Sequence, residues 1–218
     1  MASKARATRV TSKTGYHHGD LREQLVRAAR RLVARDGAAR FKVVDACRLA
    51  GVSTAAPYRH FADRQAILDA VATDGFARLA RAMRAATEGH RTGSLEALTA
   101  IGIVYVDFAR DEPHVFRLMF GSPHTTQTRD AADWTPVDEL EKSGSAAYDV
   151  LLGQIAAHLE RDPDDVAVLK TGLSMWMMVH GLSFLLVDEQ LGVGRLELDV
   201  KAMVNACGAK LLEAFVEA

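Results

Sequence analysis

The stretch VVDACRLAGVSTAAPYRH, residues 43–60, decides the fold of the N-terminal part of the chain. Small or apolar side chains stand at the i, i+3, i+4 and i+7 spacing of one helix face, at Val43, Ala46, Cys47 and Ala50. Gly51 and Val52 end that helix, and Ser53 is a good N-cap for a second short helix to about His60. Two short helices joined by a glycine turn are typical of a helix-turn-helix. A plain helical corner has the same spacing and stays open at this point.

Basic residues are concentrated around this stretch. Residues 1–64 hold 14 Lys and Arg against 5 Asp and Glu, a formal charge of +9, whereas residues 65–218 hold 13 against 23, a charge of −10. Opposite charge in the two parts indicates a polyanionic partner for the front part only. A basic face on an ordinary solvated helix is the simpler alternative.

The rest of the chain shows helical periodicity, with no strand pattern and no internal repeat. Start signals for helices stand at Asp63, at Pro113, at residues 135–136 and at residues 162–165. We therefore predict an all-α chain of about nine helices. Its domains are a disordered basic arm over residues 1–16, a three-helix helix-turn-helix domain over 17–63 and a larger helical domain over 64–218.

The cysteines and the apolar stretches bear on the compartment. Cys47 and Cys207 stand far apart in the sequence, which suits a reducing cytoplasm better than a disulfide framework. The most apolar stretch, residues 175–187, is too short to cross a bilayer, and the N-terminus has no signal-peptide pattern. These features predict a cytoplasmic protein with no membrane partner.

Two motifs resemble a known family. Residues 50–61, AGVSTAAPYRHF, resemble the recognition-helix signature of the tetracycline repressor (TetR) family, and residues 62–68, ADRQAIL, resemble the start of that family's fourth helix. Trp176 with His180-Gly181 resembles the pattern of its Trp/His-Gly (WHG) subclass, and Asp111-Glu112-Pro113, followed by Phe116 and Met119-Phe120, is similar to the same subclass. The resemblance implies a DNA-binding domain followed by a domain for ligand binding and dimerisation.

The resemblance also implies which residues touch DNA. They are Arg22, Lys42, Ser53, Thr54, Ala55, Tyr58, Arg59, His60 and Arg64. Tyr58 and His60 are expected on phosphates, and Thr54, Ala55 and Arg59 near base edges. Arg64 is expected to face a phosphate, at a position where the family more often has Lys. Lys42 departs from the Ser or Thr cap usual in the family, at a cost of roughly 1 kcal/mol, and is either a phosphate contact or simply exposed.

For the larger domain the resemblance implies a pocket for a small molecule. Its expected lining is Phe76, Met83, Tyr105, Phe108, Phe116, Met119, Phe120, Met175, Trp176, Val179 and His180. Aromatic rings and methionines adapt to apolar ligands, although each of these side chains taken alone is more often ordinary core. The last two helices are expected to pair in a homodimer.

The function predicted is that of a sequence-specific transcriptional regulator, a repressor released from a palindromic double-stranded DNA operator by an unknown apolar effector. An activator of the same family and a sequence-nonspecific DNA-binding protein are the alternatives. An enzyme is not favoured, because the sequence has no nucleophile elbow, phosphate-binding glycine loop or zinc spacing. No catalytic residue, metal or cofactor is predicted.

Overall fold

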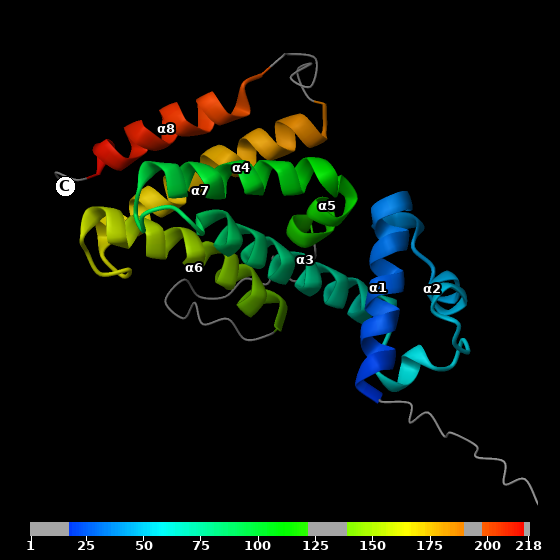
Figure 1. The fold of residues 1–218 in the computed structure, drawn as a ribbon. Helices are drawn as coiled ribbons and strands as arrows, with labels where there is room; N and C mark the ends of the chain where they lie inside the picture. Colours follow the sequence, from blue (N-terminus) through cyan, green and yellow to red (C-terminus); the bar gives the residue numbers. More distant parts are fainter. Residues whose placement is uncertain (1–17, 122–138, 190–197, 216–218) are drawn as a thin grey trace, which may run out of the picture.

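The computed structural model describes residues 18–121, 139–189 and 198–215 (Figure 1). In these ranges it contains eight α-helices, two short 3-10 helices and no strand. The elements in order are α1 (His18–Asp36), η1 (Ala38–Arg40), α2 (Val43–Ala50), η2 (Pro57–Arg59), α3 (Arg64–Thr87), α4 (Leu95–Asp111), α5 (Pro113–Gly121), α6 (Glu139–Leu159), α7 (Val166–Val187) and α8 (Val200–Ala214). The predicted all-α class is confirmed, with one α-helix fewer than the nine expected.

The missing α-helix is the one expected between Ser53 and His60. Only the 3-10 helix η2 forms there. Its hydrogen bonds span three residues, from the amide of Ala56 to the carbonyl of Ser53 (3.1 Å) and from the amide of His60 to the carbonyl of Pro57 (2.9 Å). Pro57 has no N–H, so it cannot close the four-residue bond back to Ser53 that would begin an α-helix. The expectation of a third α-helix in the N-terminal domain is therefore corrected to a tight helical turn.

Side-chain caps fix the starts of the longer helices. The carboxylate of Asp63 accepts from the amide of Ala66 (2.8 Å) at the start of α3, as the sequence predicts. The carboxylate of Asp165 likewise accepts from the amide of Ala167 (2.8 Å) at the start of α7. Lys42, at the N-cap of α2, makes no side-chain hydrogen bond to the first turn, so α2 lacks the cap that a Ser or Thr would provide.

Helices α1 and α2 stand at one end of the molecule, and α3 runs from them into the helical body (Figure 1). In that body α3 packs on α4, α5 and α6, while α8 lies along the outer side against α4 and α7. Helix α5 also touches α1 and η1, so it contacts the N-terminal unit directly. The same helix therefore faces both parts of the chain.

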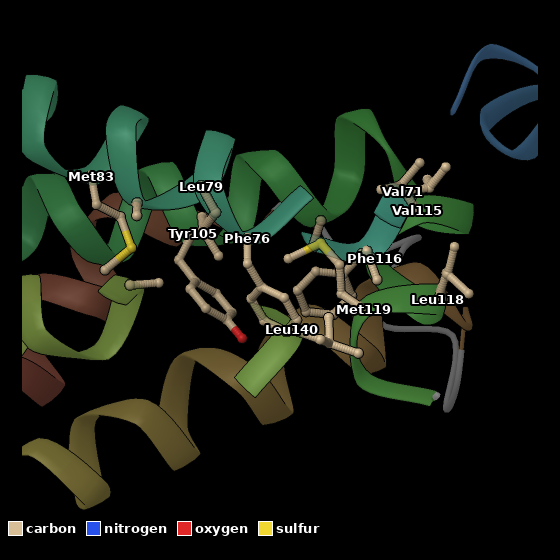
Figure 2. Close-up of a cluster of buried hydrophobic side chains, with 14 of the residues drawn as sticks. Val71, Phe76, Leu79, Met83, Tyr105, Val115, Phe116, Leu118, Met119 and Leu140 are labelled. Atoms are coloured by element: carbon tan, nitrogen blue, oxygen red, sulfur yellow. The ribbon is translucent and has the colours of Figure 1, made fainter. Parts of the chain in front are cut away.

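Large side chains fill the centre of the body. Phe76 of α3, Tyr105 of α4 and Phe116 of α5 point toward one another (Figure 2). Helices α4 and α8 approach closely, because a Cβ on Gly102 would lie 2.6 Å from Val204 Cγ1. Only glycine permits that approach without displacing α8.

Two predictions for terminal and loop segments, the basic arm at residues 1–16 and the helix start at 135–136, lie outside the described residues. Within the described ranges no helix is long and apolar enough to cross a membrane.

Candidate nucleic-acid interface and buried aromatic cluster

The turn after α2 has the geometry that its glycine permits. Gly51 is left-handed, with φ 70° and ψ 30°. Its amide donates to the carbonyl of Arg48 (3.3 Å), and the next amide, of Val52, donates to Cys47 (3.0 Å). A Cβ at Gly51 would meet nothing within 4 Å, so the backbone angle and not space demands glycine.

Most of the predicted DNA-contacting side chains of residues 42–60 are exposed. Lys42, Ser53, Thr54, Ala55, Tyr58 and Arg59 are all exposed, and His60 is half-buried. Tyr58 has 61% of its surface exposed, although it follows the buried Pro57. An aromatic ring beside a basic side chain on an exposed turn is well placed for a phosphate backbone.

Arg64 is exposed, and its guanidinium also bonds to the backbone around η1. Its Nε donates to the carbonyl of Phe41 (3.0 Å), its Nη2 donates to the carbonyl of Ala38, and its guanidinium lies 5.7 Å from the Phe41 ring centre. Arg64 therefore joins η1 to the start of α3. The expected phosphate contact of Arg64 stays a prediction beside this structural role. Arg22 is exposed and lies over the ring of Phe61 (5.3 Å).

Four charged side chains join the N-terminal unit to the body. Glu112, which follows α4, forms ion pairs with Arg78 of α3 (Nη2–Oε1 2.6 Å) and with Arg30 of α1 (Nη1–Oε1 3.4 Å). Asp74 lies 3.5 Å from Arg78 and 3.8 Å from Arg30. Burial lowers the pKa of Arg78, and the Glu112 carboxylate opposes that shift. Sequence reasoning missed this cluster because its members are separated by up to 82 positions.

An aromatic cluster occupies the body between α3, α4, α5 and α7. The predicted pocket residues brought together in it are Phe76, Tyr105, Phe116, Phe120, Trp176 and His180. Phe120 is central, with ring centres 4.6 Å from His180, 4.9 Å from Phe116 and 5.1 Å from Phe76. The Tyr105 hydroxyl lies 2.8 Å from His180 Nδ1.

A small cavity of about 30 Å³ adjoins this cluster. Its lining includes the predicted residues Met83, Met175 and Val179, and it reaches the rings at Tyr105 and Trp176. A space of this size holds about one water molecule. A larger guest therefore needs side chains of the lining to move.

Two of the predicted pocket residues lie apart. Phe108 faces the charged cluster, with the guanidinium of Arg78 5.3 Å from its ring centre. Met119 packs on Gly75, where an added Cβ would stand 2.6 Å from its sulfur. Their place in a ligand pocket stays a prediction.

Sequence reasoning missed two rings of the cluster, Phe184 and Tyr148. Phe184 lies 4.9 Å from His180 and 5.2 Å from Phe116, and Tyr148 lies 5.3 Å from Trp176. A signal for Phe184 was available, because positions 176, 180 and 184 are spaced by one helical turn and so share a face of α7. No comparable spacing points to Tyr148, which comes from α6.

A second face of α7 is apolar and uncovered. Val166, Leu169, Leu173 and Met177 are between 40% and 62% exposed, and their spacing of three or four residues makes one stripe. Met203 of the adjacent α8 is 39% exposed. We call these five residues the α7/α8 stripe. Exposed apolar residues grouped in this way make the stripe a candidate interaction site.

Two protein-family models match the chain. Residues 98–208 match the model described as "Tetracyclin repressor-like, C-terminal domain", and residues 25–71 match "Bacterial regulatory proteins, tetR family". The chain belongs to the TetR family. It thus carries the helix-turn-helix domain of DNA-binding transcriptional regulators, as the motif at residues 50–61 predicts. The narrower resemblance to the WHG subclass stays a prediction.

Solved structures share the TetR fold along nearly the whole chain. A protein of unknown function from Rhodococcus sp. RHA1 is 28% identical, with a TM-score of 0.71 over 94% of this chain and 100% of its own. A tetR-family transcriptional regulator from Streptomyces coelicolor is 17% identical, with a TM-score of 0.67 over 91% and 87%. The TetR family transcriptional regulator PfmR from Thermus thermophilus is 16% identical, with a TM-score of 0.56 over 87% and 97%. Comparison with the curated proteins finds no match.

Proposed function

We propose that this TetR-family protein is a repressor that binds a palindromic operator as a homodimer and leaves it when an apolar effector enters the aromatic cluster. The observation that carries the proposal is that one chain has three distinct sites, two on its surface and one inside the body. They are the exposed basic face at residues 42–59, the aromatic cluster in the body and the uncovered α7/α8 stripe. A regulator of this kind is not an enzyme.

The exposed turn supplies the DNA contacts. Lys42 and Tyr58 bind phosphates, and Thr54 and Arg59 lie over base edges, where Arg pairs best with guanine. Pro57 is buried and holds the turn against the domain, so these side chains are presented from a rigid support. Their number is small, so a single monomer binds weakly and two copies are needed for specificity.

The α7/α8 stripe is the surface through which a second copy of the chain binds. A stripe contributed by two helices, repeated by a twofold axis, forms a four-helix interface. A twofold dimer presents two turns about one DNA repeat apart, roughly 34–36 Å, and hence prefers a palindrome. Replacing Leu173 by Glu buries a charge at the centre of that interface and gives a monomer in light scattering. The same replacement at Val44, which is exposed on α2, leaves the dimer intact.

Two connections carry a change in the body to the DNA-binding turn. Helix α3 is continuous from Arg64, beside η1, to Phe76 in the aromatic cluster. Glu112 precedes α5 and contacts Arg30 of α1. An effector that displaces Phe116 or Phe120 therefore shifts α5 against α1, and the two half-sites lose their spacing.

The test is selection of bound sequences from a random DNA pool by the full chain at near-physiological salt. Enrichment of one palindrome with half-sites about a helical turn apart supports the proposal. Retention of DNA without an enriched sequence favours a nonspecific binder and overturns it. An enriched palindrome upstream of a gene whose transcription rises with the protein indicates an activator.

Variants separate the two kinds of DNA contact. Arg59→Ala should cost about 1–3 kcal/mol of binding and relax the preference at one base position. Lys42→Ala should weaken binding to all sequences alike and reduce the salt dependence by about one counterion. Arg91→Ala is the control. It removes an exposed basic side chain beyond the far end of α3 and should leave the affinity for DNA unchanged.

A further inference from the structure

The cavity of about 30 Å³ lies beneath α8, the outermost helix of the body. Its lining includes Val204 and Gly208 of α8, Gly102 of α4 and Met175 of α7. The lining residues come from α3, α4, α6, α7 and α8. In the part of the chain that the structure describes, none of them belongs to α5. The cavity therefore adjoins the aromatic cluster but has a wall of its own, which is α8.

The lining of this cavity suits an uncharged guest. None of the residues that line it has a charged side chain. Its two hydroxyl groups already have partners within the protein. Thr99 Oγ1 accepts from Asn205 Nδ2 (3.1 Å), and the Tyr105 hydroxyl pairs with His180 Nδ1 (2.8 Å). An ionised guest would lose its hydration without gaining a counter-ion, so the site favours a compact apolar molecule.

An organic guest must displace a wall of this cavity, because an apolar cavity that takes benzene measures about 150 Å³. The methionines of the lining can rearrange only inside the closed body, since Met83 and Met175 are 1% and 4% exposed. Helix α8 buries three residues, whereas α4 and α7 bury eight each, and α8 lies along the outer side of the body (Figure 1). The element with the fewest buried contacts moves at the lowest cost. Helix α8 is therefore the wall that moves.

The contacts that seat α8 on α4 stand at the cavity itself. A Cβ on Gly102 would lie 2.6 Å from Val204 Cγ1, so the two helices touch closely there. The hydrogen bond from Asn205 to Thr99 is on the same turn of α8. Gly102, Thr99 and Val204 all line the cavity, so a guest acts on both contacts at once. Met203, the α8 member of the α7/α8 stripe, directly precedes Val204 and is displaced with it.

We propose that the cavity beneath α8 binds a compact, uncharged apolar molecule, and that this molecule weakens the dimer by moving α8. The proposal rests on the proposed function in one respect, that the α7/α8 stripe is the dimer interface. A packed interface loses complementarity when one of its helices shifts. The coupling is reciprocal, so the guest binds a monomeric chain more tightly than the dimer by the same factor per site.

Benzene is the probe that locates the site, in spectra of the full chain labelled with ¹³C at the methionine methyl groups. Met83, Met175 and Met178 line the cavity, so their signals should shift most. Met119 packs on Gly75 of α3 and should shift least. Single replacements of methionine by leucine assign the signals. Benzoate at the same concentration should leave the spectrum unchanged. The absence of shifts at millimolar benzene, or a largest shift at Met119, overturns the proposal.

Variants of the α8 wall change the size of the cavity in opposite directions. Gly208→Ala places a methyl group 3.8 Å from Leu95 Cδ1 and 4.0 Å from Met175 Cε, at ordinary contact distance, so it fills space without strain. It should lower the affinity for benzene about tenfold, because the site is then overfilled. Val204→Ala removes two methyl groups from the wall and should raise the affinity. Gly153→Ala, exposed on α6 with nothing within 4 Å, is the matched control. Equal affinities of Gly208→Ala and Gly153→Ala would contradict the assignment.

The coupling to the dimer is measured by analytical ultracentrifugation of the full chain with and without saturating benzene. The dissociation constant of the dimer should rise about tenfold, within the usual range of coupling between two sites. In Gly208→Ala the same benzene concentration should leave the constant unchanged, which excludes binding of benzene to the stripe itself. The monomeric Leu173→Glu chain should bind benzene about tenfold more tightly than the dimeric wild type. Equal benzene affinities of these two proteins overturn the proposal.

The outcomes separate this proposal from the proposed function. A chain that is monomeric without benzene overturns the homodimer of the proposed function and, with it, the coupling through α8. A dimer that binds its palindrome and keeps its dissociation constant when saturated with benzene supports the proposed function and overturns only the role of the cavity.

Discussion

The DNA-binding unit and the helical body differ in the side chains that form their cores. The unit has a core rich in small side chains, such as Ala28, Ala29, Ala46 and Cys47, and its shape depends on Gly51 and Pro57. The body is built around large rings from five helices, and its shape depends on how these rings pack together. A backbone angle acts locally and leaves little freedom, whereas a ring cluster can repack around a guest. The rigid part therefore suits DNA and the adaptable part suits a ligand.

The largest expected effect is in the body. Phe116 is fully buried and contacts the rings of Tyr105, Phe120 and Phe184. Phe116→Ala leaves a cavity among them and should lower the free energy of unfolding by about 4 kcal/mol in a urea titration. Val44→Ala, at an exposed apolar position of the DNA-binding unit, should change it by less than about 0.5 kcal/mol. Equal effects of the two changes would contradict the contrast between the regions.

The junction between the regions should show the next largest effect. Glu112→Gln removes the nearer of the two carboxylates shared by Arg30 and Arg78 and leaves both cations with Asp74 alone. The side chains of Arg78 and Glu112 are 19% and 24% exposed, so the loss should be about 2 kcal/mol, below that of a fully buried pair. Urea titration measures it. Glu23→Gln, in an exposed pair with Arg27, is the control and should have no measurable effect. Stability unchanged by Glu112→Gln would mean that the two regions are joined by apolar packing alone.

Replacing glycine by alanine should lower the stability at Gly51 in the DNA-binding unit and raise it at Gly153 in the helical body. Gly51→Ala places a Cβ on a residue with φ 70° and should cost about 1 kcal/mol of stability. Gly153→Ala, inside α6 at an exposed position with nothing within 4 Å, should gain up to about 1 kcal/mol because alanine favours the helix. Thermal unfolding of both variants gives the comparison. Destabilisation by both would show that α6 does not tolerate a Cβ at this place.

The smallest expected effect is a pH dependence from the aromatic cluster. Burial lowers the pKa of His180 below its ordinary value of 6.5. Between the folded-state pKa and 6.5 the unfolded chain binds the proton and the folded chain does not, so the free energy of unfolding falls as the pH drops below about 6.5. Urea titrations across this range should show a smaller fall for His180→Phe than for the wild type. Tyr148→Phe, which does not titrate there, should follow the wild-type profile. A profile of His180→Phe parallel to the wild type would contradict the lowered pKa.

The sequence predicted well wherever neighbours along the chain decide the outcome. Apolar periodicity and the signals at Asp63, Gly51 and Pro113 located the described helices, because such caps and breaks act over one turn. Pro57 was also visible, but its lost N–H outweighed the helical pattern at residues 53–60, and that helix was overestimated.

The sequence by itself determined the helical class, the glycine turn after α2 and the basic charge of the N-terminal part, because these depend on spacing, caps and charge within short stretches. Only the tertiary structure decided which rings share a cluster, that Arg64 bonds to the carbonyl of Phe41 and that Arg30 meets Glu112 82 positions away. Such contacts depend on how helices pack, and the helical period gives the face of each helix but not the partner that covers it.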